Sequence, residues 1–214
     1  MSNQKPVLGI LGAGKLGTVV AQLALKAGYT VYIAGSGAVD KIKLSVEVIT
    51  PGAIAVTAEE AIKHSDIIIL ALPLSKYKNL PVAALQHKLV IDATNYWWEV
   101  DGSMTDLAQW PSSSEMIQAF LPNSHVIKAL SHIGYHNLLD DARPAGAADR
   151  KAMAIAGNDP HDTQLVATLV ANLGFDPVLI GKLAEGKKLE PGSSLFGASV
   201  DAPTLRNLAK LNNK

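Results

Sequence analysis

Three glycines near the start of the chain have the spacing of a phosphate-binding turn. Gly12, Gly14 and Gly17 come after an apolar run over 7–11 that is typical of a buried parallel strand. Apolar residues then recur every three or four positions over 16–27, which predicts an amphipathic helix. A Gly-x-Gly-x-x-Gly between a strand and a helix is a dinucleotide fingerprint, because free N–H groups at the helix start attract phosphate. We predict cofactor contacts at Gly12, Ala13, Gly14, Lys15, Leu16 and Gly17.

The end of the second predicted strand, over 30–34, indicates which dinucleotide binds. A free ribose 2′-hydroxyl is usually held by Asp or Glu about 20 residues after the motif. The chain instead reads Ala34-Gly35-Ser36-Gly37 at this point. Ser36 can donate a hydrogen bond to a 2′-phosphate, and Lys41 or Lys43 can supply positive charge. We therefore predict NADP(H) as the cofactor, with an ordinary turn serine as the alternative interpretation of Ser36.

The composition narrows the classes of protein to which the chain can belong. Its 214 residues have a formal net charge of zero, so no basic surface points to nucleic acid. There is no cysteine, which excludes disulfides and thiolate chemistry. No apolar run reaches the roughly 18 residues that span a bilayer, and no signal peptide is recognisable. We expect a cytoplasmic homodimer that acts on a small-molecule acceptor, without nucleic-acid or membrane partners.

Short apolar runs alternate with helical patterns along the rest of the chain. The further strands that we predict cover 67–72, 89–93, 126–130, 153–156 and 177–180. The predicted helices cover 39–49, 58–64 and 162–173, and surface loops are expected over 111–115 and 143–148. This alternation predicts a Rossmann-type, doubly wound α/β fold with a mostly parallel sheet and helices on both faces. We expect one domain over 1–214, with a dinucleotide-binding core in 1–128 and elements that shape an acceptor site in 129–214.

The loops that follow the predicted strands hold most of the candidate site residues. Ligands of such sheets bind outside the carboxyl ends of the strands. Leu72 and Pro73 should therefore pass the ribose and diphosphate, and Asn95 should orient a hydroxyl or an amide. The run Tyr96-Trp97-Trp98 can form a wall for a flat ring, or it can anchor its loop to the core.

His132 and His136 lie four residues apart in the loop after the strand over 126–130. On a helix this spacing could hold a metal ion, but Gly134 lies between them and a third ligand is not evident. We therefore predict no metal site. His132 is the one candidate catalytic residue, as a ring contact or a proton relay. The other four histidines are expected at the surface: His64, His87, His125 and His161.

The chain resembles the NADP oxidoreductases typified by coenzyme F420-dependent NADP reductase, which moves hydride between NADP and a deazaflavin. The resemblance is carried by residues 9–17, 35–36, 71–73, 92–95 and 126–130. The same core is similar to the cytosolic domain of the six-transmembrane epithelial metalloreductases, which pass hydride from NADPH to a flavin. It is also similar to the N-terminal Rossmann domain of pyrroline-5-carboxylate reductases.

The resemblance implies a role for each candidate residue. It assigns cofactor contacts to Ser36, Leu72, Pro73 and Asn95, beside the glycine turn. The acceptor ring would stack against Leu130, Ser131, His132, Ile133 and Gly134. A segment over 189–196 would close over the acceptor, with contacts from Ser193 and Phe196. The chain departs from the family at Gly37, where relatives commonly have arginine, and at Ser131, where they often have Asn or His.

Three functions remain open at this point. The first is hydride transfer between NADP(H) and a flavin or deazaflavin (F420), which needs ring alignment more than acid–base groups. The second is a carbonyl or imine reductase, which needs a proton donor, and the candidates are His132, Tyr135 and His136. The third is a sensor that binds NADPH without turnover.

Overall fold

Short strands alternate with helices in the computed structural model, which describes residues 5–210. The strands are β1 (Leu8–Leu11), β2 (Val31–Ala34), β3 (Ile54–Ala55), β4 (Ile67–Leu70), β5 (Leu89–Asp92), β6 (His125–Lys128), β7 (Ala152–Gly157) and β8 (Asp176–Gly181). The α-helices are α1 (Lys15–Lys26), α2 (Asp40–Ile49), α3 (Ala58–Lys63), α4 (Val82–Leu85), α5 (Trp98–Asp101), α6 (Ser113–Phe120), α7 (Tyr135–Asp141), α8 (Pro160–Asn172) and α9 (Ala202–Leu208). The 3₁₀ helices are η1 (Leu74–Asn79), η2 (Leu107–Gln109) and η3 (Leu183–Leu189).

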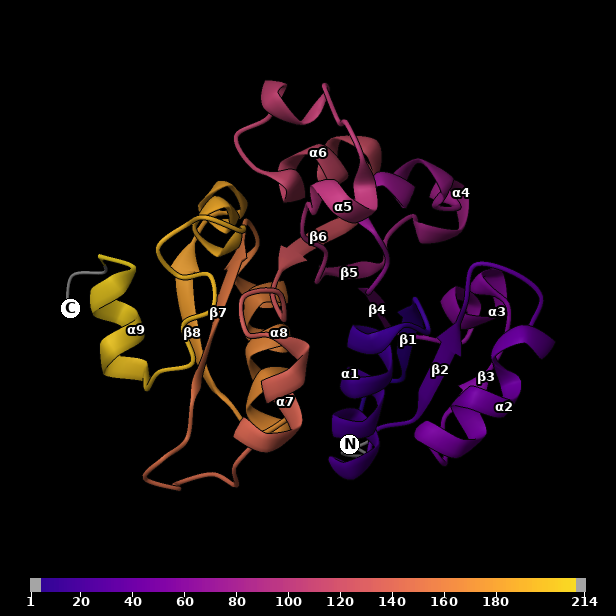
Figure 1. Ribbon diagram of the computed structural model, residues 1–214, viewed down its shortest axis with the longest axis horizontal. Helices are drawn as coiled ribbons and strands as arrows, with labels where there is room; N and C mark the ends of the chain where they lie inside the picture. Colours follow the sequence, from indigo (N-terminus) through magenta and orange to yellow (C-terminus); the bar gives the residue numbers. More distant parts are fainter. Residues whose placement is uncertain (1–4, 211–214) are drawn as a thin grey trace.

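All of these strands form one sheet in the order β3-β2-β1-β4-β5-β6-β7-β8 (Figure 1). β1 to β6 run parallel, whereas β7 pairs antiparallel with β6 and parallel with β8. The predicted Rossmann-type, mostly parallel sheet is therefore confirmed. Because β1 to β6 are parallel, the loops that follow them meet at one edge, which we call the carboxyl edge.

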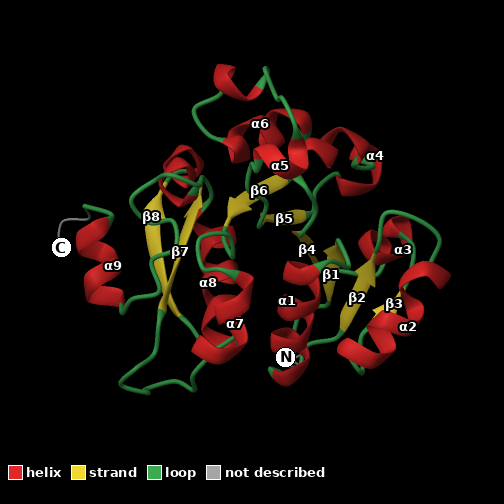
Figure 2. Ribbon diagram, in the orientation of Figure 1, coloured by secondary structure: helices red, strands yellow, loops and turns green. Residues whose placement is uncertain are grey.

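The sheet has a separate apolar layer on each face, with α1, α7 and α8 on one side and α6 on the other (Figure 2). Ile10, Ile69 and Ile91 belong to the layer that contains α1, α7 and α8. Val90 and Val126 belong to the layer that contains α6 and η3. A third cluster packs α9 and the C-terminal segment against β7 and β8. Neighbouring residues of one strand thus serve opposite layers, as the alternation of strand side chains requires.

Helix α6 occupies part of a segment for which we predicted a surface loop. The loop prediction over 111–115 was wrong, because α6 begins at Ser113. The Ser112 hydroxyl caps the helix by accepting a hydrogen bond from the Glu115 backbone N–H. A run of serines indicates a turn as readily as a helix start, since the same side chains satisfy backbone groups in both.

The predicted helices over 39–49, 58–64 and 162–173 are confirmed as α2, α3 and α8. The sequence analysis did not predict β3, α4, α5, α7 and α9 as elements. Of these, β3, α4 and α5 have only two to four residues, which is too few to establish a periodic pattern. Among the described residues, no helix is both long and apolar enough to cross a membrane.

Candidate active site

The predicted phosphate-binding turn lies between β1 and α1, at the carboxyl edge. Gly12 has a φ of +128°, and a Cβ at this position would lie 2.1 Å from the Ala71 carbonyl oxygen. A Cβ on Gly17 would lie 1.8 Å from the Gly12 carbonyl oxygen. The Cβ position of Gly14, in contrast, has no heavy atom within 4 Å. The turn is therefore packed tightly at Gly12 and Gly17 and open at Gly14, where a phosphate can approach the backbone.

The start of α1 suits an anion. Gly14 is its N-cap, no side chain caps it, and its first turn contains no acidic residue. The first N–H groups of the helix and its positive dipole end are therefore available to a phosphate. Ala13 and Leu16 pack against the core and hold the turn in place. Lys15 lies with its Nζ 5.6 Å from the ring centre of Tyr135, the first residue of α7, so α7 adjoins the turn.

The loop after β2 carries polar groups and no carboxylate. Ser36 is exposed in this loop. The Cβ position of Gly37 lies 3.6 Å from the Nζ of Lys41, which belongs to the first turn of α2. The side chain of Lys41 thus lies over the glycine at which relatives commonly carry arginine. A cation reaches this loop from α2 instead of from position 37.

The segment after β4 runs beside the glycine turn. The Ala71 carbonyl oxygen is the atom that a Cβ on Gly12 would meet, so the two segments are in contact. Leu72 packs on the apolar layer that contains α6, and Pro73 is exposed at the start of η1. Both residues lie at the carboxyl edge, in the position expected for a segment that passes a ribose and diphosphate.

Asn95 links two loops at the carboxyl edge. Its Nδ2 donates a hydrogen bond of 2.6 Å to the Ser131 carbonyl oxygen. The Asn95 Oδ1 and the Ser131 hydroxyl are buried, and neither has a hydrogen-bond partner among the described residues. Buried polar atoms are rarely left unpaired in proteins. A ligand with amide or hydroxyl groups, such as the carboxamide of a nicotinamide, would satisfy them.

The predicted acceptor loop, residues 130–134, begins with an unusual backbone conformation. Leu130 has a φ of +61°, which a branched apolar residue adopts only when its surroundings impose it. The side chains of Leu130 and Ile133 belong to the core, and His132 is completely buried. Gly134 is exposed. A ligand at this loop would therefore meet backbone groups and Gly134 more than the side chains of Leu130, His132 and Ile133.

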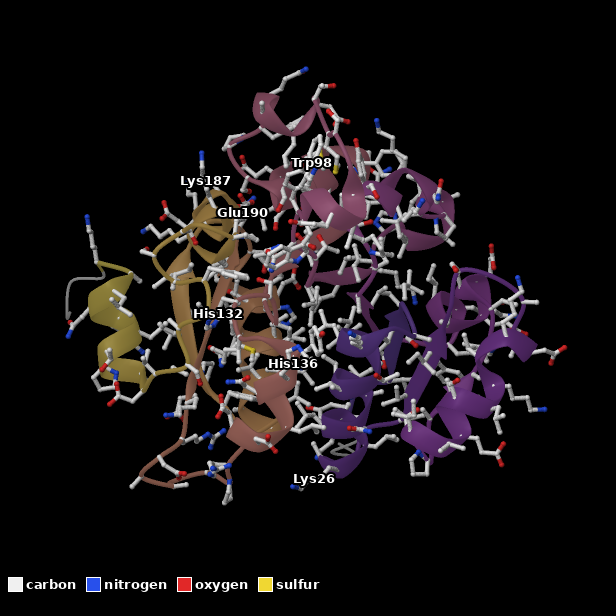
Figure 3. All side chains as sticks on the ribbon, in the orientation of Figure 1. Lys26, Trp98, His132, His136, Lys187 and Glu190 are labelled. Carbon is white, nitrogen blue, oxygen red and sulfur yellow. The ribbon has the colours of Figure 1, made fainter. Side chains whose placement is uncertain are left out.

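The imidazole of His132 links the loop after β6 to β7. Its Nε2 accepts a hydrogen bond of 3.0 Å from the Ala154 N–H, so the proton of the neutral ring is on Nδ1. Burial lowers the pKa of His132 to about 4. A hydrogen bond with the Leu195 backbone raises the pKa, but by less. The ring is therefore neutral at physiological pH. In Figure 3 it lies beside β7, whereas His136 lies towards α1.

The C-terminal segment packs against the loop over residues 130–134. The Gly197 N–H donates a hydrogen bond of 2.7 Å to the His132 carbonyl oxygen. The ring of Phe196 contacts the ring of Trp97, which lies in the loop after β5. Ser193 is half-buried, and its hydroxyl donates to the Lys188 carbonyl oxygen at 2.5 Å. Phe196 therefore packs against the loop after β5, while Ser193 stabilises the segment itself.

One group of buried polar residues at the carboxyl edge was not predicted as part of the site. Asp92 ends β5, Lys128 ends β6, and both side chains are completely buried as an ion pair. The available signal was a charged residue at the end of an otherwise apolar strand, in the runs LVID and HVIK. Buried charges of this kind are rare unless they are paired.

A large hollow lies at the opposite edge of the sheet and contains none of the predicted site residues. Its volume is about 510 Å³, and its lining includes His125, Asp159 and Asp162. The Nδ1 atom of His125 lies 2.5 Å from Asp162 Oδ2, where β6 begins beside the start of α8. His64, His87 and His161 are exposed like His125, as predicted.

Comparison with known proteins finds a family match for the first part of the chain. Residues 7–96 match the family model described as NADP oxidoreductase, coenzyme F420-dependent. This segment is similar to that family. It contains the glycine turn, the loop after β2, the segment after β4 and Asn95, so the resemblance inferred from these motifs is confirmed.

Two curated relatives extend the comparison. The chain is 24% identical over 205 residues to Metalloreductase STEAP3 of Rattus norvegicus, which covers 94% of this chain and 39% of the relative. It is 35% identical over 79 residues to the protein YjhV of Escherichia coli K12, which covers 37% of this chain and 55% of the relative. The chain therefore spans only about two fifths of the length of one curated relative and just over half of the length of the other.

Two solved structures share the fold over most of the chain. The hypothetical protein SMa0349 of Sinorhizobium meliloti superposes with a TM-score of 0.78 at 24% identity, over 91% of this chain and 94% of that one. A candidate F420-dependent NADP-reductase from Arthrobacter sp. FB24 superposes with a TM-score of 0.69 at 20% identity, over 85% and 87%. At these identities the likeness establishes the fold, including the part beyond residue 96.

Proposed function

We propose that this protein is an NADPH-dependent oxidoreductase that transfers hydride from NADPH to a flavin- or deazaflavin-type acceptor. The observation that carries the proposal is the link between the cofactor loops and the acceptor loop at one edge of the sheet. Asn95 makes this link through the Ser131 carbonyl, and its own Oδ1 is left for a ligand. The family match over residues 7–96 supports NADP(H) as the cofactor.

The protein's own contribution is to bind and align. The open backbone at Gly14 and the start of α1 hold the pyrophosphate, and Ser36 with Lys41 binds the 2′-phosphate. Asn95 Oδ1, which has no partner among the described residues, would accept a hydrogen bond from the carboxamide of a bound nicotinamide and so orient its ring. When bound, NADPH supplies the hydride from its nicotinamide. The acceptor also takes up one proton, so NADPH, acceptor and H⁺ give NADP⁺ and the reduced acceptor.

A ring-type acceptor is favoured over a carbonyl or an imine because His132, the candidate catalytic residue, is not placed to act as an acid. His132 is neutral and buried, and its Nε2 is occupied by the Ala154 N–H. A carbonyl oxygen needs a positioned proton donor as its charge develops. A flavin or deazaflavin needs mainly a flat slot at the correct distance. The exposed rings of Trp97 and Trp98 beside the loop fit such an aromatic acceptor.

Steady-state oxidation of NADPH, followed by its absorbance with FMN, FAD or F420 as acceptor, tests the proposal. We expect saturable oxidation with at least one of these acceptors. Tight NADPH binding without turnover in any of them would favour the sensor. Turnover with a cyclic imine or a ketone alone would favour the carbonyl or imine reductase. The homodimer is proposed as the assembly, and light scattering of the purified chain measures it.

A further inference from the structure

The buried ion pair of Asp92 and Lys128 lies beneath the candidate site and has no role in the function proposed above. The two residues are direct register partners at the ends of β5 and β6. Lys128 Nζ lies 3.2 Å from Asp92 Oδ2, and neither side chain is exposed at all. A buried ion pair is weak evidence for stability, because apolar residues of similar volume often replace it without loss. This pair therefore calls for another explanation.

On one side, the pair holds the loop that carries Asn95. Asp92 Oδ1 accepts hydrogen bonds from the Thr94 N–H at 2.9 Å and from the Thr94 hydroxyl at 2.7 Å. The Lys128 ammonium donates to the Thr94 carbonyl oxygen. Three polar atoms of Thr94 are thus bound to the pair, and Asn95 is the next residue. Asn95 is therefore held in two ways: through Thr94 by the ion pair, and directly by its hydrogen bond to the Ser131 carbonyl oxygen.

On its other side, the pair contacts the elements that carry the C-terminal segment. The Ser114 hydroxyl of α6 donates to Asp92 Oδ2 at 2.5 Å. The backbone of η3 packs directly on the lysine, because a Cβ on Gly186 would lie 3.1 Å from Lys128 Cγ. Glu190, labelled in Figure 3, follows η3, and its Oε1 accepts a hydrogen bond of 2.7 Å from the Ser113 N–H. From this anchored point the chain continues to Phe196.

We propose that Asp92 and Lys128 are positioning residues that fix both walls of the acceptor slot. One wall is the Asn95–Trp97 loop, which the pair holds through Thr94. The other wall is the segment after η3, residues 190–196, which is positioned because η3 packs against Lys128. The inference rests on the proposed function for its activity readout, whereas the position of the loop can be measured without any turnover.

The test removes both charges together, so that no unpaired charge stays buried. In the double variant Lys128→Met/Asp92→Asn, the clamp on the Thr94 carbonyl is lost while the core volume is kept. We expect kcat with FMN to fall by about tenfold to a hundredfold, since small misplacements of a reacting geometry have effects of this size. The Kd for NADPH should rise by a smaller factor than kcat falls, because the phosphate-binding turn is untouched and only the Asn95 contact is affected.

The matched control is Lys88→Met. Like Lys128, Lys88 donates a hydrogen bond from its Nζ to a backbone carbonyl oxygen, that of Ser65, at 2.7 Å. Lys88 comes just before β5 begins, at the edge of the sheet opposite the candidate site. This variant should keep the wild-type kcat. A double variant that retains both the melting temperature and the kcat of the wild type would overturn the proposal. So would an equal loss of kcat in Lys88→Met.

A second variant covers the case in which the double variant does not fold. Gly186→Ala changes no charge and places a methyl group against Lys128 from the η3 side. We expect a smaller fall in kcat, of about threefold to tenfold, with NADPH affinity retained. An unchanged kcat in a folded Gly186→Ala protein would contradict the proposal that packing of η3 against Lys128 positions the acceptor site.

Fluorescence of Trp97 separates this inference from the proposed function. The chain has three tryptophans, so Trp98→Phe/Trp110→Phe leaves Trp97 as the single emitter. In this background, the double variant should raise the acrylamide quenching constant of Trp97, because its loop is no longer held. An unchanged quenching constant would overturn the inference. If the wild type oxidises NADPH with none of FMN, FAD and F420, the proposed function fails, and the quenching result still decides whether the ion pair holds the loop.

Discussion

The rings of Trp97 and Phe196 meet edge to face, with their centroids 5.6 Å apart and their planes at 65°. Trp97 belongs to the loop after β5, and Phe196 belongs to the segment after η3. The contact therefore joins the loop that also carries Asn95 to the C-terminal segment. It also borders the acceptor loop, because the next residue, Gly197, donates its N–H to the His132 carbonyl.

This contact predicts that Phe196 affects the acceptor and not the cofactor. Phe196→Ala removes one side of the aromatic pair, and such pairs contribute about 0.5–1.5 kcal/mol beyond their burial. The KM for FMN should rise by roughly threefold to tenfold, with an unchanged Kd for NADPH. Trp110→Ala is the control, because Trp110 is an exposed tryptophan (39%) outside the loops of the candidate site. Weaker NADPH binding in Phe196→Ala would place this residue in the cofactor site instead.

The position of Lys41 predicts how the protein distinguishes the two nicotinamide cofactors. We expect NADPH to bind at least about tenfold more tightly than NADH, a difference of roughly 1.4 kcal/mol. Lys41→Ala should remove a large part of this preference by weakening NADPH binding alone. Lys43→Ala, two residues further along α2, should leave the preference unchanged. Calorimetric titrations of both variants with both cofactors measure this, and equal dissociation constants in the wild type would refute the assignment.

Gly14 gives a direct test of the phosphate site. Its Cβ position has no neighbour within 4 Å and its φ of −88° suits any residue, so Gly14→Val should fold normally. A branched side chain there fills the space that the pyrophosphate needs, and NADPH binding should be abolished. Circular dichroism checks the fold and calorimetry checks the binding. Retained affinity in a folded variant would show that the pyrophosphate binds elsewhere.

Burial of His132 predicts a dependence of stability on pH. The pKa of this residue is about 4 in the folded protein, whereas an exposed histidine titrates near 6.5. The unfolded chain therefore takes up a proton first as the pH falls, and the free energy of unfolding decreases between pH 6.5 and pH 4. The loss is about 3 kcal/mol, at 1.36 kcal/mol per unit of pKa. Above pH 6.5 this contribution does not change.

His132→Gln is the variant that isolates this effect. Glutamine can still accept the hydrogen bond from the Ala154 N–H, but it does not titrate. Denaturant unfolding from pH 7 to pH 4 should therefore show a shallower fall for the variant than for the wild type, whereas His64→Gln at the surface should behave like the wild type. Turnover with FMN should fall by less than about tenfold, because the ring donates no proton to the acceptor. A loss of a hundredfold or more with NADPH binding intact would return His132 to the role of general acid.

Much of the fold could be predicted from local patterns in the sequence. The apolar runs of β1 and β4 stand out because these strands are buried on both faces. The glycines at 12, 14 and 17 indicate the turn. Gly12 and Gly17 are required there by backbone conformation and close packing, whereas Gly14 leaves open space at the start of α1. The antiparallel direction of β7 could not be predicted, because it depends on pairing with β6 across an intervening helix and loop.

The residues that hold the site together were harder to find than those that contact a ligand. Asp92 and Lys128 meet only when β5 and β6 pair in register, so neither residue indicates its partner by spacing. Helix α6 was missed for a related reason, since Ser113 and Ser114 are buried by partners that are distant in sequence, Glu190 and Asp92. Lys41 was one of two candidate cations, and only the packing over Gly37 distinguishes it from Lys43.

Transfer of a deuterium label is the most direct test of the central claim. NADPH carrying deuterium at the transferred C4 position is mixed with the protein and F420, and the reduced deazaflavin is analysed by mass spectrometry. Carbon 5 of a deazaflavin does not exchange its hydrogen with water, so direct hydride transfer should add one mass unit to the product. The account predicts this label in the product, with the Gly14→Val protein giving none. NADPH that binds tightly and yet passes no deuterium to F420, and no electrons to FMN or FAD, would contradict the account.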